Sequence, residues 1–77
     1  MAKVQIYTTQ SCHYCHMAKE YFKSKGIEYQ EYDVQTDAAK RDEMLAKTGM
    51  MGVPVIDIDG KIVIGFDRAK INEYLGL

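Results

Sequence analysis

The sequence predicts a single α/β domain, residues 1–77, whose strands and helices follow one another in the order βαβαββα. Three observations support this prediction. The chain opens with alternating polar and apolar residues, two segments with helical spacing each end at a glycine, and an Asp-Gly pair joins two short β-branched runs. A chain of 77 residues can bury one hydrophobic core and has no room for a second catalytic domain.

Composition and charge exclude several classes of function. The net charge is −1, and the basic doublet Lys40-Arg41 lies among acidic neighbours, so the sequence has no footprint of nucleic-acid binding. No apolar run approaches the length of a membrane span, and the first residues alternate in polarity where an export signal would be hydrophobic. We therefore expect a cytoplasmic monomer that binds neither nucleic acid nor membrane.

The first strand and helix are predicted from residues 3–26. Residues 3–8 alternate with period two, which is typical of a half-buried strand. Ser11 is a favourable N-cap, and Cys15, Ala18 and Phe22 follow at helical spacing until Gly26 ends the helix. The helix is thus expected to begin at the cysteines.

A second strand and a second helix follow. Residues 27–34 are rich in tyrosine and valine and predict a strand. Asp37 can cap a helix whose Met44, Leu45 and Thr48 form one face, and Gly49 ends it.

The C-terminal third predicts a hairpin and a short helix. Residues 53–58 and 61–64 are two β-branched runs, and the Asp59-Gly60 pair between them favours a type I′ turn, so these strands are antiparallel. Asp67 can cap a last helix with an apolar face.

Three motifs at characteristic separations resemble those of glutaredoxins. They are Cys12-His13-Tyr14-Cys15 after the first strand, Val53-Pro54 at the third, and Gly65-Phe66-Asp67 before the last helix. The resemblance covers nearly the whole chain and implies a thioredoxin-like fold: a four-stranded mixed sheet in the order 2-1-3-4, flanked by three helices. The Gly65-Phe66 pair is also similar to the redoxin that feeds ribonucleotide reductase, although the tryptophan typical of that subgroup is absent.

The two cysteines carry the predicted chemistry. Disulfide exchange needs an accessible thiolate and a second thiol that resolves the mixed disulfide. Cys12 lies at the expected helix start, where free N–H groups and the helix dipole favour an anion by roughly 0.3 to 2 kcal/mol. Cys15 is one turn further on and deeper. We assign Cys12 as nucleophile and Cys15 as resolving thiol, within a motif completed by Ser11, His13 and Tyr14.

The histidine within this motif has two interpretations. It stands where the common glutaredoxin motif has proline. His13 is either a solvated polar residue or, when protonated, a charge that stabilises the Cys12 thiolate.

The resemblance also implies a substrate groove. In the family the proline corresponding to Pro54 is cis and lies beside the sulfurs, which leaves Val53 free to pair with a substrate backbone. Tyr7, Met50 and Met51 are ambiguous between groove and core.

Glutathione recognition in the family uses a basic residue before the first cysteine and often another before the proline segment. This chain has Thr9 and Met50 at those places. Its Gly65, Phe66 and Asp67 stand where the family binds the glutamyl group, although Ile64 replaces the first glycine of that pattern. Two charge contacts are thus missing.

These features predict a thiol-disulfide oxidoreductase that reduces protein disulfides or glutathione mixed disulfides. We expect no tightly bound cofactor, with glutathione as a co-substrate. The electron donor is then either glutathione or a flavoprotein of the thioredoxin-reductase type.

Other interpretations of the cysteines remain open. They could be buried apolar residues. The run Cys12-His13-Tyr14-Cys15-His16 matches the c-type haem attachment pattern, with Met50 or Met51 as axial ligand. Some glutaredoxins bridge an iron–sulfur cluster between subunits through the first cysteine and glutathione. A zinc site is disfavoured, because ligands from one helical turn cannot converge tetrahedrally.

Overall fold

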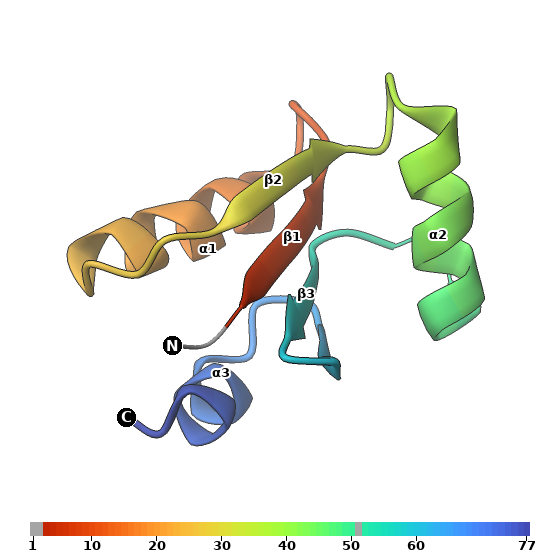
Figure 1. The fold of residues 1–77 in the computed structure, drawn as a ribbon. Helices are drawn as coiled ribbons and strands as arrows, with labels where there is room; N and C mark the ends of the chain where they lie inside the picture. Colours follow the sequence, from red (N-terminus) through yellow and green to blue (C-terminus); the bar gives the residue numbers. More distant parts are fainter. Residues whose placement is uncertain (1–2, 51) are drawn as a thin grey trace.

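Four strands form one mixed sheet in the order β2-β1-β3-β4, with a helix after each of β1, β2 and β4 (Figure 1). The structure, a computed structural model, describes residues 3–50 and 52–77. The elements are β1 (Val4–Thr8), α1 (His13–Ser24), β2 (Gln30–Asp33), α2 (Ala38–Thr48), β3 (Val55–Ile58), β4 (Lys61–Ile64) and α3 (Arg68–Leu75).

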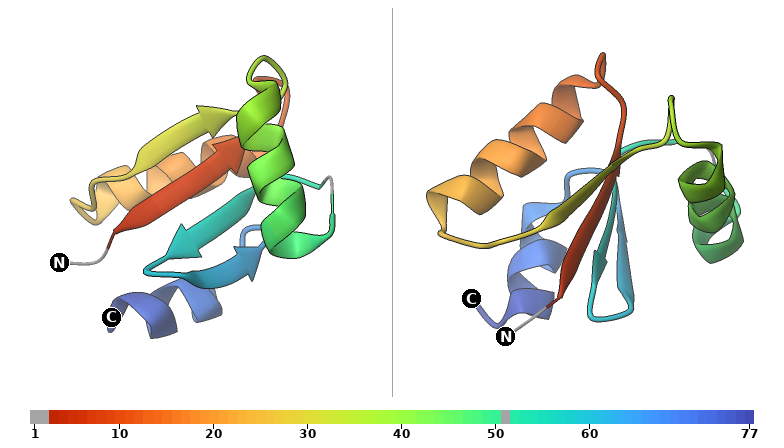
Figure 2. Two further views of the ribbon diagram at one scale, coloured as in Figure 1. Left: turned by 45° about the vertical axis from the view of Figure 1, so that its right-hand side comes forward. Right: turned by 45° about the horizontal axis from the view of Figure 1, so that its top comes forward.

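Strand directions confirm the predicted thioredoxin-like topology. β1 runs parallel to β2 and antiparallel to β3, and β3 and β4 form the expected antiparallel hairpin. Helices α1 and α3 cover one face of the sheet and α2 covers the other (Figure 2). The loops that follow β1 and precede β3 meet at the same end of these antiparallel neighbours, so residues 9–12 and 52–54 are brought together there.

Each face of the sheet has its own core. The larger core lies under α1 and α3 and contains the buried residues Val4, Ile6, Ala18, Phe22, Ile56, Ile58, Val63 and Ile71. The smaller core, under α2, contains Tyr7, Val34, Met44 and Val55. Tyr7, which the sequence left between groove and core, is therefore a core residue.

Local signals placed most helix ends and turns correctly. Asp37 and Asp67 cap α2 and α3, each accepting an N–H bond from the residue three positions on. Gly49 ends α2 with a positive φ of 70°, a conformation that glycine adopts without strain. Asp59 and Gly60 both have positive φ, as a type I′ turn requires.

Two strands begin at least two residues later than the sequence predicts. The second was expected over residues 27–34 but begins at Gln30, because the Ile27 N–H bonds to the Phe22 carbonyl at 2.9 Å and so belongs to the end of α1. The third was expected from residue 53 but begins at Val55. Pro54 has no N–H to donate to a neighbouring strand, and the Val53–Pro54 bond is cis.

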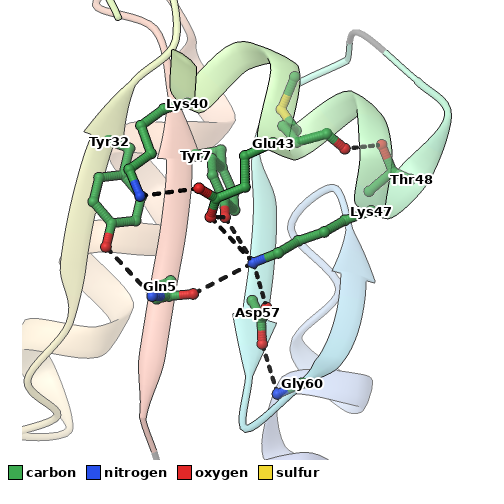
Figure 3. Close-up of polar contacts among 10 residues, drawn as sticks. Gln5, Tyr7, Tyr32, Lys40, Glu43, Lys47, Thr48, Asp57 and Gly60 are labelled. Carbon is green, nitrogen blue, oxygen red and sulfur yellow. Dashed lines mark hydrogen bonds and ion pairs between the residues drawn. The ribbon is translucent and has the colours of Figure 1, made fainter.

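A polar network anchors α2 to the sheet (Figure 3). The Lys47 ammonium lies 2.8 Å from both Asp57 Oδ2 and the Tyr7 hydroxyl, and that hydroxyl donates to Glu43 Oε1 at 2.6 Å. Burial opposes the charge on Lys47, but its bonds to Asp57 and Tyr7 outweigh this effect and raise the pKa of Lys47. The network thus joins one helix to β1 and β3 across the smaller core.

None of the helices in residues 3–50 and 52–77 is long and apolar enough to span a membrane.

Candidate functional site

Cys12 is itself the N-cap of α1. Its sulfur accepts the N–H of Cys15 at 3.1 Å, and its own N–H donates to the Thr9 carbonyl at 3.3 Å. The expectation that Ser11 caps this helix was wrong: the Thr9–Cys12 bond closes a turn that contains Ser11, so the helix begins one residue later. As a result the Cys12 sulfur, rather than a hydroxyl, occupies the helix start, where free N–H groups and the helix dipole favour an anion.

Cys15 lies directly behind Cys12 and is fully buried, whereas Cys12 is half-buried. Burial, followed by a hydrogen bond with Cys12, raises the pKa of the Cys15 thiol to about 12. Both cysteines are free thiols. One thiol is accessible at a helix end and the other is protonated and shielded behind it, which is the asymmetry that disulfide exchange through a mixed disulfide needs.

The loop before β3 completes the surroundings of Cys12. The Cys12 thiol lies 3.8 Å from the carbonyl oxygen of Val53 and donates to it. Pro54 follows in a buried position after its cis bond. The structure therefore brings the Val53-Pro54 motif against the first cysteine, although 41 positions separate Val53 from Cys12.

The Gly65-Phe66-Asp67 motif is divided between two roles. The Gly65 N–H bonds to the Pro54 carbonyl at 2.8 Å, which ties the start of α3 to the loop beside Cys12. Asp67 Oδ1 accepts the N–H of Lys70 and so caps α3. Phe66 packs against the larger core with its ring 5.9 Å from that of Tyr21, so this side chain is partly structural.

Three of the predicted residues, Thr9, Tyr14 and Met50, are uncharged, and we call them the rim of the site. Tyr14 is 61% exposed and Met50 is 49% exposed. Thr9, half-buried, contributes no cation where the family has one. Met51, predicted for groove, core or haem ligation, lies outside the described residues.

A surface groove adjoins the motif on the α1 side. His13 lines this groove with His16, Met17 and Phe66, and its volume is about 580 Å³. The charged residues Glu20 and Arg68 also line it. The His13 ring also meets the Tyr14 ring edge-on at 5.8 Å between centroids. The imidazoles of His13 and His16 are both exposed. This exposure fits a residue that contacts a substrate and equally fits a solvated residue.

The sequence did not predict a role for three residues that the structure joins in one polar cluster: Thr8, Lys19 and Glu31. The Lys19 ammonium lies 2.8 Å from Glu31 Oε2, and the buried Thr8 hydroxyl donates to the same oxygen at 2.9 Å. The signal for Lys19 was its position four residues after Cys15, which places both on one helix face. Nothing local marks Glu31, because its pairing depends on β2 lying beside β1.

Among residues 3–50 and 52–77, no group of three or more His, Cys, Asp and Glu side chains is arranged to hold a metal ion.

Known proteins are similar to this chain over most of its length. Residues 4–63 match the family model for glutaredoxin. Over 72 residues the chain is 42% identical to the uncharacterized glutaredoxin-like 8.6 kDa protein in the rubredoxin operon of Clostridium pasteurianum, covering 94% of this chain and 96% of that protein. It is 46% identical over 67 residues to glutaredoxin 3 of Escherichia coli K12, with coverage of 87% and 81%.

The fold has close structural relatives as well. The crystal structure of the T8A mutant of the thioredoxin-like protein BC3987 superposes with a TM-score of 0.91 at 34% identity, over 99% of this chain and 97% of that one. The expected sheet order and helix arrangement are therefore confirmed at the level of the whole domain.

Proposed function

The chain belongs to the glutaredoxin family, and from this premise we propose that it reduces protein disulfides, and more slowly glutathione mixed disulfides, by cycling Cys12 and Cys15 between dithiol and disulfide. The observation that carries the proposal is the cap of α1. Cys12 Sγ accepts the Cys15 N–H at 3.1 Å at the start of the helix, and Cys15 is buried one turn behind it. The N–H bond and the helix dipole both favour negative charge on the outer sulfur.

The reaction proceeds in two exchanges. The Cys12 thiolate attacks one sulfur of the substrate disulfide, forming a Cys12–substrate disulfide and releasing the other sulfur as a thiolate. Cys15 then loses its proton and attacks Cys12 Sγ, which forms the Cys12–Cys15 disulfide and releases the second substrate thiolate. The two released thiolates take up the Cys15 proton and one proton from water. The substrate gains two electrons and the protein dithiol loses them.

The Val53 backbone positions the substrate in this proposal. Its carbonyl already lies 3.8 Å from Cys12 Sγ, and residues 52–54 are not part of a strand. An extended substrate segment can therefore pair with this stretch of backbone and present its disulfide to the sulfur.

An external thiol donor regenerates the dithiol by the same exchange in reverse, and no tightly bound cofactor is needed. The rim indicates which donor is favoured. Thr9 and exposed Met50 offer no charge to the carboxylates of glutathione, so we propose that a dithiol flavoprotein of the thioredoxin-reductase type is the better donor.

The test compares two cysteine variants on two substrates. We expect Cys12→Ser to abolish reduction of both a protein disulfide and a small glutathione mixed disulfide. Cys15→Ser is expected to lose only the protein disulfide, because a second glutathione molecule can replace the internal resolving thiol. Residual activity in Cys12→Ser together with a fully inactive Cys15→Ser would reverse the assignment.

The donor is tested separately with the wild-type protein. Turnover is measured with glutathione and glutathione reductase, and in parallel with thioredoxin reductase, each with its nicotinamide reductant. We expect faster turnover with thioredoxin reductase. Equal or faster turnover with glutathione would contradict the inference drawn from the uncharged rim.

A further inference from the structure

A charged cluster lies on the sheet face that α1 covers, and its helix residue is one turn from the resolving thiol. It consists of Lys19, Glu31 and Thr8, and we call it the Lys19 cluster. Glu31 Oε2 receives both the Lys19 ammonium, at 2.8 Å, and the Thr8 hydroxyl, at 2.9 Å. Thr8 is 1% exposed, so the carboxylate is anchored to β1 by a buried donor. The hydrogen bond from Lys19 outweighs partial burial and lowers the pKa of Glu31, so the pair is ionised.

The cluster is placed to act on Cys15. Lys19 follows Cys15 by one helical turn, so the two side chains leave the same face of α1, the face that packs on the sheet. The Lys19 side chain is only 18% exposed. Burial raises the pKa of Cys15 most strongly, while the Thr9 N–H and the charge of Lys19 lower it. Glu31 pairs with the charge of Lys19.

A cation at the position of Lys19 affects the resolving step. Before that step Cys12 is bonded to the substrate in the mixed disulfide and carries no charge, while Cys15 is a buried, protonated thiol. Its sulfur becomes negative as the proton leaves and the attack on Cys12 begins. A cation within a helical turn, in partly desolvated surroundings, stabilises that charge.

Resting on the dithiol cycle proposed above, we propose that Lys19 accelerates the resolving step by stabilising negative charge on Cys15, and that Glu31, held by Thr8, is a positioning residue that fixes the ammonium and attenuates its charge. The two members of one ion pair thus have opposite effects on the rate. A purely structural pair joining α1 to β2 would not behave in this way, because removing either member would weaken the same contact.

The size of the effect follows from thiol chemistry. A tenfold loss of thiolate is partly offset by the greater nucleophilicity of the more basic sulfur, with a Brønsted slope of about 0.4 to 0.5, so the rate falls about threefold. Removing the charge of Lys19 is therefore expected to slow resolution by up to about threefold. Removing the charge of Glu31, while keeping an oxygen that accepts from Thr8, is expected to accelerate it by up to about threefold.

A chromogenic aromatic disulfide separates the two steps. The reduced protein releases one coloured thiolate when Cys12 attacks, at a rate proportional to reagent concentration, and a second when Cys15 resolves, at a rate independent of concentration. Both releases are followed by stopped-flow absorbance for wild type, Lys19→Met, Lys19→Gln and Glu31→Gln. Lys23→Met and Glu28→Gln remove the same charges from exposed positions and serve as matched controls. Cys15→Ser should show the first release only.

The outcomes are distinct. We expect the second release to be slower in both Lys19 variants and faster in Glu31→Gln, with the first release and the control variants unchanged. Lys19→Gln keeps a hydrogen-bond donor for Glu31, so it tests the same charge if Lys19→Met fails to fold. Thermal melts are recorded for all variants. A Glu31→Gln rate at or below wild type, or unchanged Lys19 variants, would overturn the inference. Absence of a first release in the wild type would instead refute the proposed function.

Discussion

Replacing Lys47 with methionine tests how far the fold depends on the polar network beneath α2. The Lys47 ammonium lies 2.8 Å from Asp57 and from Tyr7, and 3.5 Å from Glu43 (Figure 3). Asp57 is only 7% exposed, and Tyr7 is fully buried. The substitution therefore leaves a buried carboxylate without its cation and a buried hydroxyl with one partner fewer.

The expected cost can be bounded from these contacts. Breaking a fully buried ion pair by removing one partner costs about 3 to 5 kcal/mol. Two features of this site reduce the cost: the Lys47 side chain is 28% exposed, and Asp57 keeps the Gly60 N–H at 2.7 Å. We therefore expect the free energy of unfolding to fall by about 2 kcal/mol. For a domain of this size that corresponds to a decrease in Tm of roughly 8 to 16 °C.

Urea and thermal unfolding followed by circular dichroism measure this change. Lys70→Met is the matched control, because Lys70 is exposed on α3. Adding Asp57→Asn to Lys47→Met should recover part of the loss, since the buried charge is then removed as well. A Lys47→Met variant no less stable than Lys70→Met, with no recovery in the double variant, would refute the view that the network stabilises the fold.

Three further predictions concern pH and the rim of the site. Hydrogen bonds from Tyr7 and Lys40 lower the pKa of Glu43 to about 2, so its contribution is complete above the range of a free glutamate and is lost as the pH falls towards 2. Acid lowers the free energy of unfolding as Glu43 is protonated. Because the Glu43 side chain is 37% exposed, Glu43→Gln should reduce this acid-induced loss by less than about 1 kcal/mol, as measured by urea unfolding. Thr9→Lys should increase glutathione-dependent turnover, and an unchanged rate would contradict the missing-charge explanation. His13→Ala should make the reduction potential slightly more negative near pH 6 and change it less near pH 8; a pH-independent effect would leave His13 a solvated residue.

The cap of α1 links the fold to the chemistry. Capping with serine, threonine, aspartate or asparagine is preferred elsewhere because their side-chain oxygens satisfy a free N–H. Here Cys12 Sγ does so, and it accepts from Cys15, its expected resolving partner. The same backbone bond therefore supports the helix start and favours charge on the outer sulfur.

Interactions between residues near in sequence determined what could be predicted directly. Caps at Asp37 and Asp67 and the turn at Asp59-Gly60 depend on side chains and backbone groups within a few positions, so the residue types are sufficient evidence. The pairing of Cys12 with Cys15 is equally local, because one helical turn separates them. The order of strands and helices could be predicted from these caps and turns, and the family motifs could be read directly from the sequence.

The tertiary structure decided the rest, because the remaining contacts join segments far apart in the chain. Val53 reaches Cys12 only because antiparallel β1 and β3 bring their loops to one end of the sheet. Glu31 meets Lys19 only because β2 lies beside β1 under α1. A charged residue in a sequence has many candidate partners, and only the strand order and the face on which each side chain projects select one of them.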